Sequence, residues 1–254
     1  MSTVFGFDNL SRSAAASAQD RLREHIRARA VELGYNPTRI EPVYDGVADW
    51  GAYLAAPRKI CWVLKEPVET DDTGNSAGGG WTMFRDFGEG RTLASVANAN
   101  TTLRNVARAS WALLSGVSRL ADVPRISDRP EVADALLRVC YLNTGKMPAA
   151  TRTSDEQLRK VHDEWREVVL DQIELANPDL LIFAGTLQVW AADLGLDISR
   201  PRHTAVRGSC RADVHEWSGR RVLWTDHPAT PKPPEDWTDS LLEAAGAASR
   251  RTTS

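Results

Sequence analysis

KICWVLKEP, residues 59–67, contains five consecutive apolar residues between two lysines. A short, continuous apolar run is typical of a strand that is buried on both faces of a sheet. Three later segments have the same pattern, and each stops at a short polar segment: 139–142 (VCYL), 179–184 (DLLIFA) and 221–225 (RVLWT). The sequence therefore predicts four core strands.

Helical patterns separate these strands. Residues 14–33 place apolar side chains at helical spacing and stop at Gly34, a residue that commonly ends helices. Ser154 predicts the start of a helix that runs to Ala176, because Ser154 and Gln157 have the spacing of a capping box. Three further helices are expected, over about 92–114, 130–137 and 187–194.

Strands that alternate with helices favour one three-layer α/β/α domain around a central, mostly parallel four-stranded sheet. The segments 211–217 and 220–225 are joined by Ser218-Gly219, which predicts a hairpin whose second arm is the last core strand. The glycine-rich run 71–80 is expected to be a mobile loop. The expected organisation is an N-terminal helical extension packed on the core, an α/β domain and a disordered tail, over 1–57, 58–243 and 244–254.

The composition argues against several classes of protein. Cys61, Cys140 and Cys210 are widely spaced, so we expect neither a disulfide framework nor a zinc or iron–sulphur site. The net charge of −3 is not that of a tight duplex-DNA binder, although it leaves room for a local basic groove. No apolar run approaches the roughly 20 residues of a membrane helix, and the N-terminus lacks a secretory signal pattern. We therefore expect a monomeric, cytoplasmic protein that has no contact with membranes.

Polar side chains that could carry chemistry follow each predicted strand. They are Lys65-Glu66-Pro67, Asn143 with Lys146 close behind, Gly185-Thr186 and His227-Pro228. Ligands of open α/β sheets bind beyond the carboxyl ends of the strands, so a carboxylate, a carboxamide and an imidazole are expected on one rim. Each of these residues is also an ordinary turn former on its own. Their coincidence at one edge favours a site formed by Glu66, Asn143 and His227.

The order of these motifs resembles the uracil-DNA glycosylase superfamily. There, one strand ends in G-Q-D-P-Y or G-E-x-P-G, a later strand ends in a base-reading Asn, and a last strand ends in His-Pro-Ser. The counterparts here are Leu64-Lys65-Glu66-Pro67, Tyr141-Leu142-Asn143 and His227-Pro228-Ala229. Residues 171–182 are also similar to that superfamily's segment before its third core strand. The resemblance covers about residues 58–243, and Tyr44-Asp45-Gly46 looks like a little-characterised bacterial branch.

The chain departs from the superfamily pattern at three positions. Lys65 stands where the family has Gln or Glu, and Ala229 stands where it has Ser. Val68 replaces a Tyr that excludes thymine in the well-studied branch. These departures leave the expected fold unchanged and leave the recognised base open.

The resemblance implies metal-independent and cofactor-free hydrolysis of the N-glycosidic bond of a flipped or unpaired base in DNA, either uracil or another modified base. Glu66 would hold the attacking water and stabilise the oxocarbenium-like sugar. His227 would donate a hydrogen bond to the base carbonyl as negative charge develops on it. Asn143 would read the base edge, and Trp81 or Phe84 would stack on the base. Pro67 and Pro228 complete the substrate-binding set that the resemblance implies.

Phosphate contacts are expected from a few cations: Lys65, Lys146, Lys232 and Arg152. The loop over 227–237 has prolines in place of a bulky apolar wedge, so single-stranded DNA, lesion-containing DNA and a free nucleotide all remain candidate ligands. One alternative is a catalytically silent module on the same fold that binds nucleic acid or a nucleotide. Another is a metal-dependent hydrolase that uses Asp213, His215, Asp226 and His227.

Overall fold

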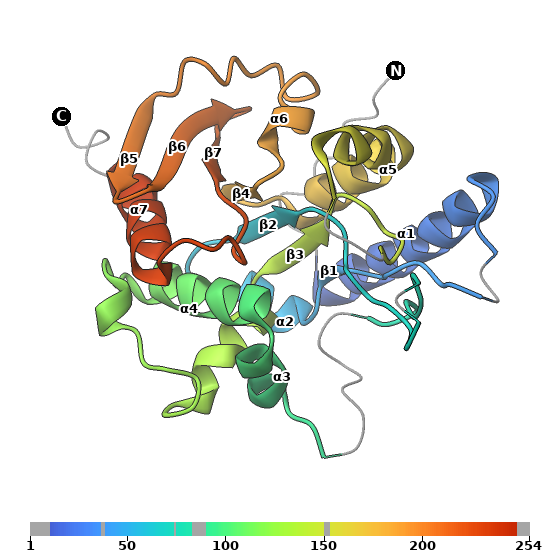
Figure 1. Cartoon of the computed structure of the whole chain (residues 1–254), viewed down its shortest axis with the longest axis horizontal. Coiled ribbons are helices and arrows are strands. Elements are labelled where there is room, and N and C mark those ends of the chain that lie inside the picture. The colour runs from blue at the N-terminus through green and yellow to red at the C-terminus, as the bar shows by residue number, and fades with distance from the viewer. Residues whose placement is uncertain (1–10, 37–38, 74, 83–89, 150–152, 248–254) are drawn as a thin grey trace.

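The computed structural model describes residues 11–36, 39–73, 75–82, 90–149 and 153–247. In this part of the chain, seven strands form one sheet in the order β1-β3-β2-β4-β7-β6-β5 (Figure 1). The strands are β1 (Gly46–Val47), β2 (Ile60–Leu64), β3 (Cys140–Asn143), β4 (Leu180–Ala184), β5 (His203–Arg207), β6 (Cys210–Trp217) and β7 (Arg220–Thr225).

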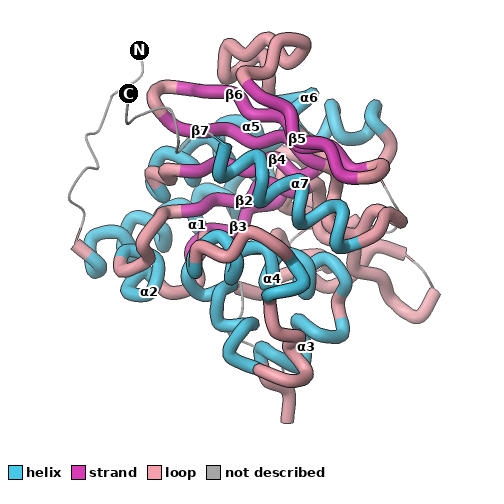
Figure 2. Tube along the Cα trace, turned by 90° about the vertical axis from the view of Figure 1, so that its left-hand side faces the viewer, coloured by secondary structure: helices cyan, strands magenta, loops and turns pink. Residues whose placement is uncertain are grey.

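Helices cover both faces of the sheet, and Figure 2 shows the strands between the two sets. Side chains alternate along a strand, so Trp62 packs into the cluster shared with α4, α7 and η2, whereas Val63 packs with α1, α5 and α6. The helices are α1 (Arg12–Glu32), α2 (Trp50–Leu54), α3 (Leu93–Ala99), α4 (Thr101–Ser115), α5 (Asp155–Ala176), α6 (Leu187–Trp190), α7 (Pro234–Ala247) and the 3₁₀ helices η1 (Leu120–Asp122) and η2 (Pro130–Arg138).

The four strands expected from the sequence form the centre of the sheet and run parallel to one another, since β2 pairs with β3 and β4, and β4 pairs with β7. The expected total of four strands was wrong. β1 adds an antiparallel strand beside β3, and β6 and β5 add two beside β7. The domain is therefore α/β with a mixed sheet, parallel in the middle and antiparallel at both edges.

Local sequence signals explain most element boundaries. Ser154 and Gln157 form the predicted capping box at the start of α5. The predicted hairpin joins β6 to β7 through Ser218 and Gly219, whose φ angles of 47° and 76° match the left-handed residues of a tight hairpin turn. The helix expected over 92–114 is divided into α3 and α4, because the Asn100 side chain accepts a hydrogen bond from Leu103 N and begins a new helix.

Regular secondary structure lies at both of the expected domain ends. The segment before residue 58 is not only helical, because β1 joins the sheet, and Gln19 of α1 pairs with both backbone groups of Val47. α7 runs to Ala247 with Ala244 and Ala245 buried, so the chain is still ordered where a tail was expected to begin.

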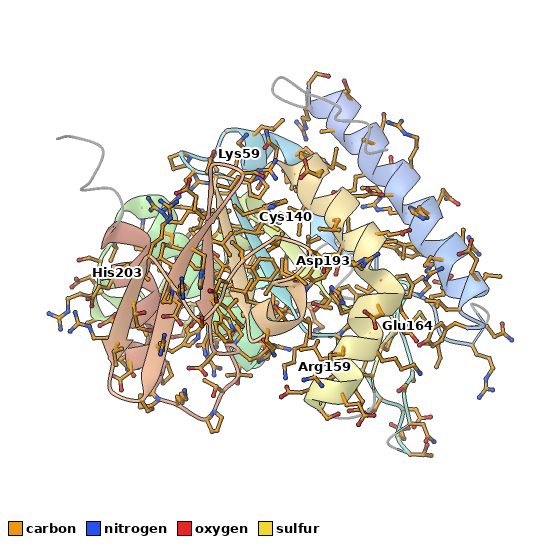
Figure 3. The ribbon with its side chains drawn as sticks, turned by 90° about the horizontal axis from the view of Figure 1, so that it is seen from above. Lys59, Cys140, Arg159, Glu164, Asp193 and His203 are labelled. Carbon is orange, nitrogen blue, oxygen red and sulfur yellow. The ribbon has the colours of Figure 1, made fainter. Side chains whose placement is uncertain are left out.

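α1 and α5 lie side by side on the outside of the domain (Figure 3). Ile26 and Ala30 of α1 pack against Trp165 of α5, and the Arg29 side chain donates a hydrogen bond to Glu164 O at 3.0 Å. The N-terminal segment is thereby tied to the core. Across the described residues, no helix combines the length and the apolar character that a membrane span requires.

Candidate active site

A cavity of about 850 Å³ opens at the carboxyl ends of the central strands. Glu66 follows β2, Asn143 ends β3 and His227 follows β7, and all three side chains line this cavity. The structure thus brings together the three residues that the sequence placed on one rim. Leu64, Tyr141, Val96 and Leu103 are among the apolar residues that complete the walls.

Backbone contacts between the ends of β2 and β3 hold Glu66 in place. Thr144 donates two hydrogen bonds to Leu64 O, from its N–H at 2.7 Å and from its hydroxyl at 2.8 Å. Gly145 N donates to Lys65 O at 3.1 Å. A Cβ on Gly145 would lie 3.1 Å from Glu66 Cβ and 2.5 Å from a methyl group of Val161. Glycine is therefore required for the close approach of these two loops.

The Glu66 carboxyl group has an unusual environment. Burial raises its pKa from 4.5 to about 7, against the opposing effects of Lys65 and of a backbone hydrogen bond within Glu66. Its Oε2 atom is buried and has no hydrogen-bond partner among the described residues. Among the described residues, no donor to Oε2 is therefore present to favour the ionised form of this carboxyl group. At neutral pH both protonation states of this carboxyl group are therefore populated. A general base works best with a pKa near the working pH.

His227 is fixed by the turn that follows β7. Its Nδ1 atom accepts a hydrogen bond from Ala229 N at 3.2 Å, so the proton of the neutral ring lies on Nε2, which is a donor. Asn105 of α4 donates to Pro228 O at 2.7 Å and holds the same turn from the helix side. Gly185 has a φ of +75°, and a Cβ there would lie 3.3 Å from His227 Cβ and from His227 N. The imidazole is therefore positioned from three directions.

Asn143 is 4% exposed, and its backbone N–H and its Nδ2 both donate to Oδ2 of Asp45, at 2.6 and 3.1 Å. Asp45 precedes β1 and was not among the predicted site residues. The only sequence signal for it was its place in Tyr44-Asp45-Gly46. Its contact with Asn143 spans 98 residues of chain, which local patterns cannot reveal.

Two of the predicted phosphate ligands are engaged in ion pairs. Lys146 is fully buried, with Nζ 2.6 Å from Asp45 Oδ1 and 2.8 Å from Asn143 O. Lys232 pairs with Asp226 at 2.7 Å. Lys65 does line the cavity, and so does Arg91, which the sequence reasoning missed. Arg152 lies outside the described residues.

Of the two aromatic residues predicted to stack on a base, Trp81 lines the cavity. Its Nε1 donates a hydrogen bond to Glu69 Oε2 at 3.0 Å. Phe84 lies outside the described residues. Tyr141 adds a second aromatic wall that was not predicted as a site residue. Pro67 lines the cavity as expected, but Pro228 is buried beside it, and the residues that follow it, Ala229, Thr230 and Pro231, form the wall instead.

The two acidic residues of the metal-hydrolase alternative have other partners. Asp213 accepts two hydrogen bonds from Arg211 Nε and one from Thr204, and Asp226 pairs with Lys232. In the part of the chain that the structure describes, no group of three or more His, Cys, Asp or Glu side chains is placed to hold a metal ion. Asp213, His215, Asp226 and His227 thus do not form a ligand set there.

Comparison with known proteins assigns no family to the chain. No protein-family model matches it, and no curated protein matches its sequence. The residues of the cavity and their chemistry are therefore the basis for the function.

Proposed function

We propose that the protein is a uracil-DNA-glycosylase-like enzyme that hydrolyses the N-glycosidic bond of a flipped or unpaired base in DNA. One observation carries the proposal: Glu66, Asn143 and His227, from three different strand ends, line one cavity. Its volume of about 850 Å³ lies within the range of ligand pockets and is ample for a base with its sugar. The parallel order β3-β2-β4-β7 supports the further proposal that the domain has that superfamily's fold.

The three polar groups have the chemistry that this reaction needs. The bond between C1′ and the base nitrogen breaks with its electron pair leaving on the base, and the sugar becomes oxocarbenium-like. Ionised Glu66 stabilises that positive charge and accepts a proton from the attacking water, a role that its pKa of about 7 suits. The Nε2 proton of His227 forms a hydrogen bond with the base as negative charge develops there. Asn143 offers its amide to the base edge.

The rest of the cavity suits an unpaired nucleotide. Trp81 and Tyr141 supply aromatic faces, and Lys65 and Arg91 supply cations for a phosphate group. Because Lys146 and Lys232 are held in ion pairs, Lys65 and Arg91 are the cations that the described cavity lining offers to a nucleic-acid backbone. Single-stranded DNA is therefore the substrate that we favour.

The test is incubation with oligonucleotides that carry one uracil, hypoxanthine or normal cytosine, in single- and double-stranded form, followed by alkaline cleavage of abasic sites. We expect cleavage of a modified-base single strand by the wild-type protein and its loss in Glu66→Gln. Glu69→Gln is a matched control, because Glu69 lines the same cavity but its carboxylate is held by Gly79 and Trp81. Binding without cleavage in the wild-type protein would instead support the catalytically silent module, and neither binding nor cleavage would refute both functions.

A further inference from the structure

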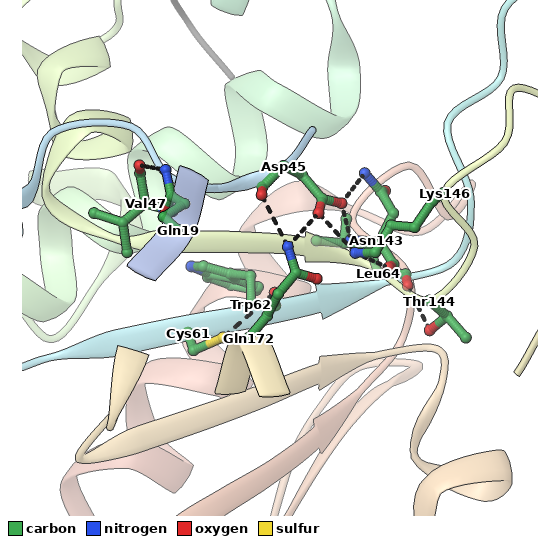
Figure 4. A network of polar contacts seen from close by, with 10 residues as sticks. All are labelled: Gln19, Asp45, Val47, Cys61, Trp62, Leu64, Asn143, Thr144, Lys146 and Gln172. Carbon is green, nitrogen blue, oxygen red and sulfur yellow. Dashed lines mark hydrogen bonds and ion pairs between the residues drawn. The ribbon is translucent and has the colours of Figure 1, made fainter. Parts of the chain in front are cut away.

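A buried network of polar side chains lies directly behind Asn143 (Figure 4). At its centre is Asp45, which is 1% exposed and whose carboxylate accepts hydrogen bonds from three other residues. Oδ2 accepts from the backbone and the side chain of Asn143, at 2.6 and 3.1 Å. Oδ1 accepts from Lys146 Nζ at 2.6 Å and from Gln172 Nε2 at 3.1 Å. Both carboxylate oxygens are therefore fully engaged.

The charge of Asp45 is balanced by Lys146, and both side chains of this ion pair are completely buried. Lys146 also donates to Asn143 O at 2.8 Å, which ties the pair to the same residue. An ionised carboxylate only accepts hydrogen bonds, so any group that faces it must be a donor. Of the two ends of the Asn143 amide, only Nδ2 can face Asp45, because turning Oδ1 toward it would oppose two acceptors.

The opposite end of the amide is left for the cavity. Among the described residues, no group donates a hydrogen bond to Asn143 Oδ1. This oxygen atom is also not fully buried. Asn143 itself lines the cavity. We infer that Asp45 is a positioning residue, and this inference rests on the proposed function. Asp45 fixes the amide of Asn143, so that a bound base meets one defined arrangement of acceptor and donor. Asp45 thereby sets which base is accepted.

The choice of variants follows from the burial of the ion pair. Removing Asp45 alone would leave Lys146 charged and unpaired in the interior, which usually destabilises a fold severely. Both charges are therefore removed together, in two double variants that share Lys146→Met. Asp45→Leu removes every acceptor for the amide, whereas Asp45→Asn keeps one oxygen that can accept from Nδ2. Both double variants lack the ion pair, so the effect of losing its two charges is common to both, and they differ in whether residue 45 keeps a polar amide whose oxygen can accept from Nδ2.

The first measurement is the relative rate of excision from single-stranded oligonucleotides that carry uracil, hypoxanthine or cytosine at one position. We expect the preference for the best base to fall about tenfold or more in Asp45→Leu/Lys146→Met, since a bidentate contact to a base edge discriminates by about that factor. We expect Asp45→Asn/Lys146→Met to keep most of the preference. Equal losses on all three bases in both double variants would show a merely structural role and overturn the inference.

The second measurement is made on the wild-type protein and does not need activity. In ¹⁵N-labelled wild-type protein, with the side-chain signals assigned by Asn143→Ala, one Nδ2 proton of Asn143 should exchange with solvent much more slowly than the other. Equally fast exchange of both protons would overturn the inference. If the wild-type protein excises no base, the proposed function fails, and added free uracil and cytosine then test the positioning role. Base-selective shifts of the Asn143 amide signals would support it, and no shift with either base would overturn it.

Discussion

Replacing Glu66 by glutamine should make the protein more stable at alkaline pH while it abolishes cleavage. In the folded protein the pKa of Glu66 is about 7, against 4.5 for an ordinary glutamate, so the folded state keeps a proton that the unfolded chain releases between these values. Stability therefore falls as the pH rises through this window, and the loss is complete above about pH 7. Glutamine keeps the volume and has no charge to desolvate.

The magnitude follows from the size of the shift. Raising the pKa from 4.5 to about 7 corresponds to about 3 kcal/mol, at about 1.36 kcal/mol for each pKa unit. Glu66 is only half-buried, and solvent screening reduces this figure to about 2 kcal/mol. For a chain of 254 residues, that difference corresponds to about 4–8 °C in Tm. Glu66→Gln should exceed the wild-type Tm by about this much at about pH 8 and match it at about pH 4.

The assay is thermal unfolding by circular dichroism at a series of pH values, on wild type, Glu66→Gln and Glu69→Gln. Glu69→Gln should gain no stability at any pH, because Glu69 Oε2 already accepts hydrogen bonds from Gly79 N and Trp81 Nε1. A Glu66→Gln protein that is less stable than wild type above neutrality, or whose advantage does not change with pH, would refute the reasoning that burial raises this pKa.

Three further predictions concern the same cavity. Initial cleavage rates should rise with pH with a midpoint near 7, the pKa of Glu66, because the ionised form is the active one; a midpoint near 4.5 would show that the free carboxyl behaves as an ordinary glutamate. His227→Ala should lower the single-turnover rate constant about 100- to 1000-fold and leave the unfolding curve unchanged, since it removes one donor to the leaving base, and full activity would exclude His227 from the reaction. In binding titrations of single-stranded DNA at several salt concentrations, Lys65→Met and Arg91→Met should each flatten the log–log slope by about 0.7. Lys232→Met should leave that slope unchanged because Lys232 is already paired with Asp226, and an equal effect of all three changes would contradict the assignment.

The sequence was sufficient for the central strands and for the three residues at their ends. Each of those strands is a short apolar run that needs no distant partner to be recognised, and Glu66, Asn143 and His227 follow the runs directly. Because parallel strands share one carboxyl edge, local patterns were enough to place these three residues together.

One missed feature depends on a contact between distant residues, and the others on local features that an apolar pattern does not reveal. Lys146 looked like an exposed loop lysine, and its burial is possible only because Asp45, 101 residues earlier, neutralises it. β1 has only two residues, and β5 exposes several of its side chains, so neither has the apolar pattern of a core strand. Asn100 divides the predicted long helix through its own side chain, a competition between capping and helix continuation that apolar periodicity does not register.

We propose one direct test of whether Glu66, Asn143 and His227 form one active site for N-glycosidic hydrolysis. Abasic sites are counted after incubation of a uracil-containing single strand with the wild-type protein, Glu66→Gln, Asn143→Ala and His227→Ala, with binding of the same strand measured in parallel. We expect abasic sites with the wild-type protein and a deep loss with each variant, while Glu66→Gln still binds the strand. Cleavage that persists in Glu66→Gln and His227→Ala alike would contradict this expectation.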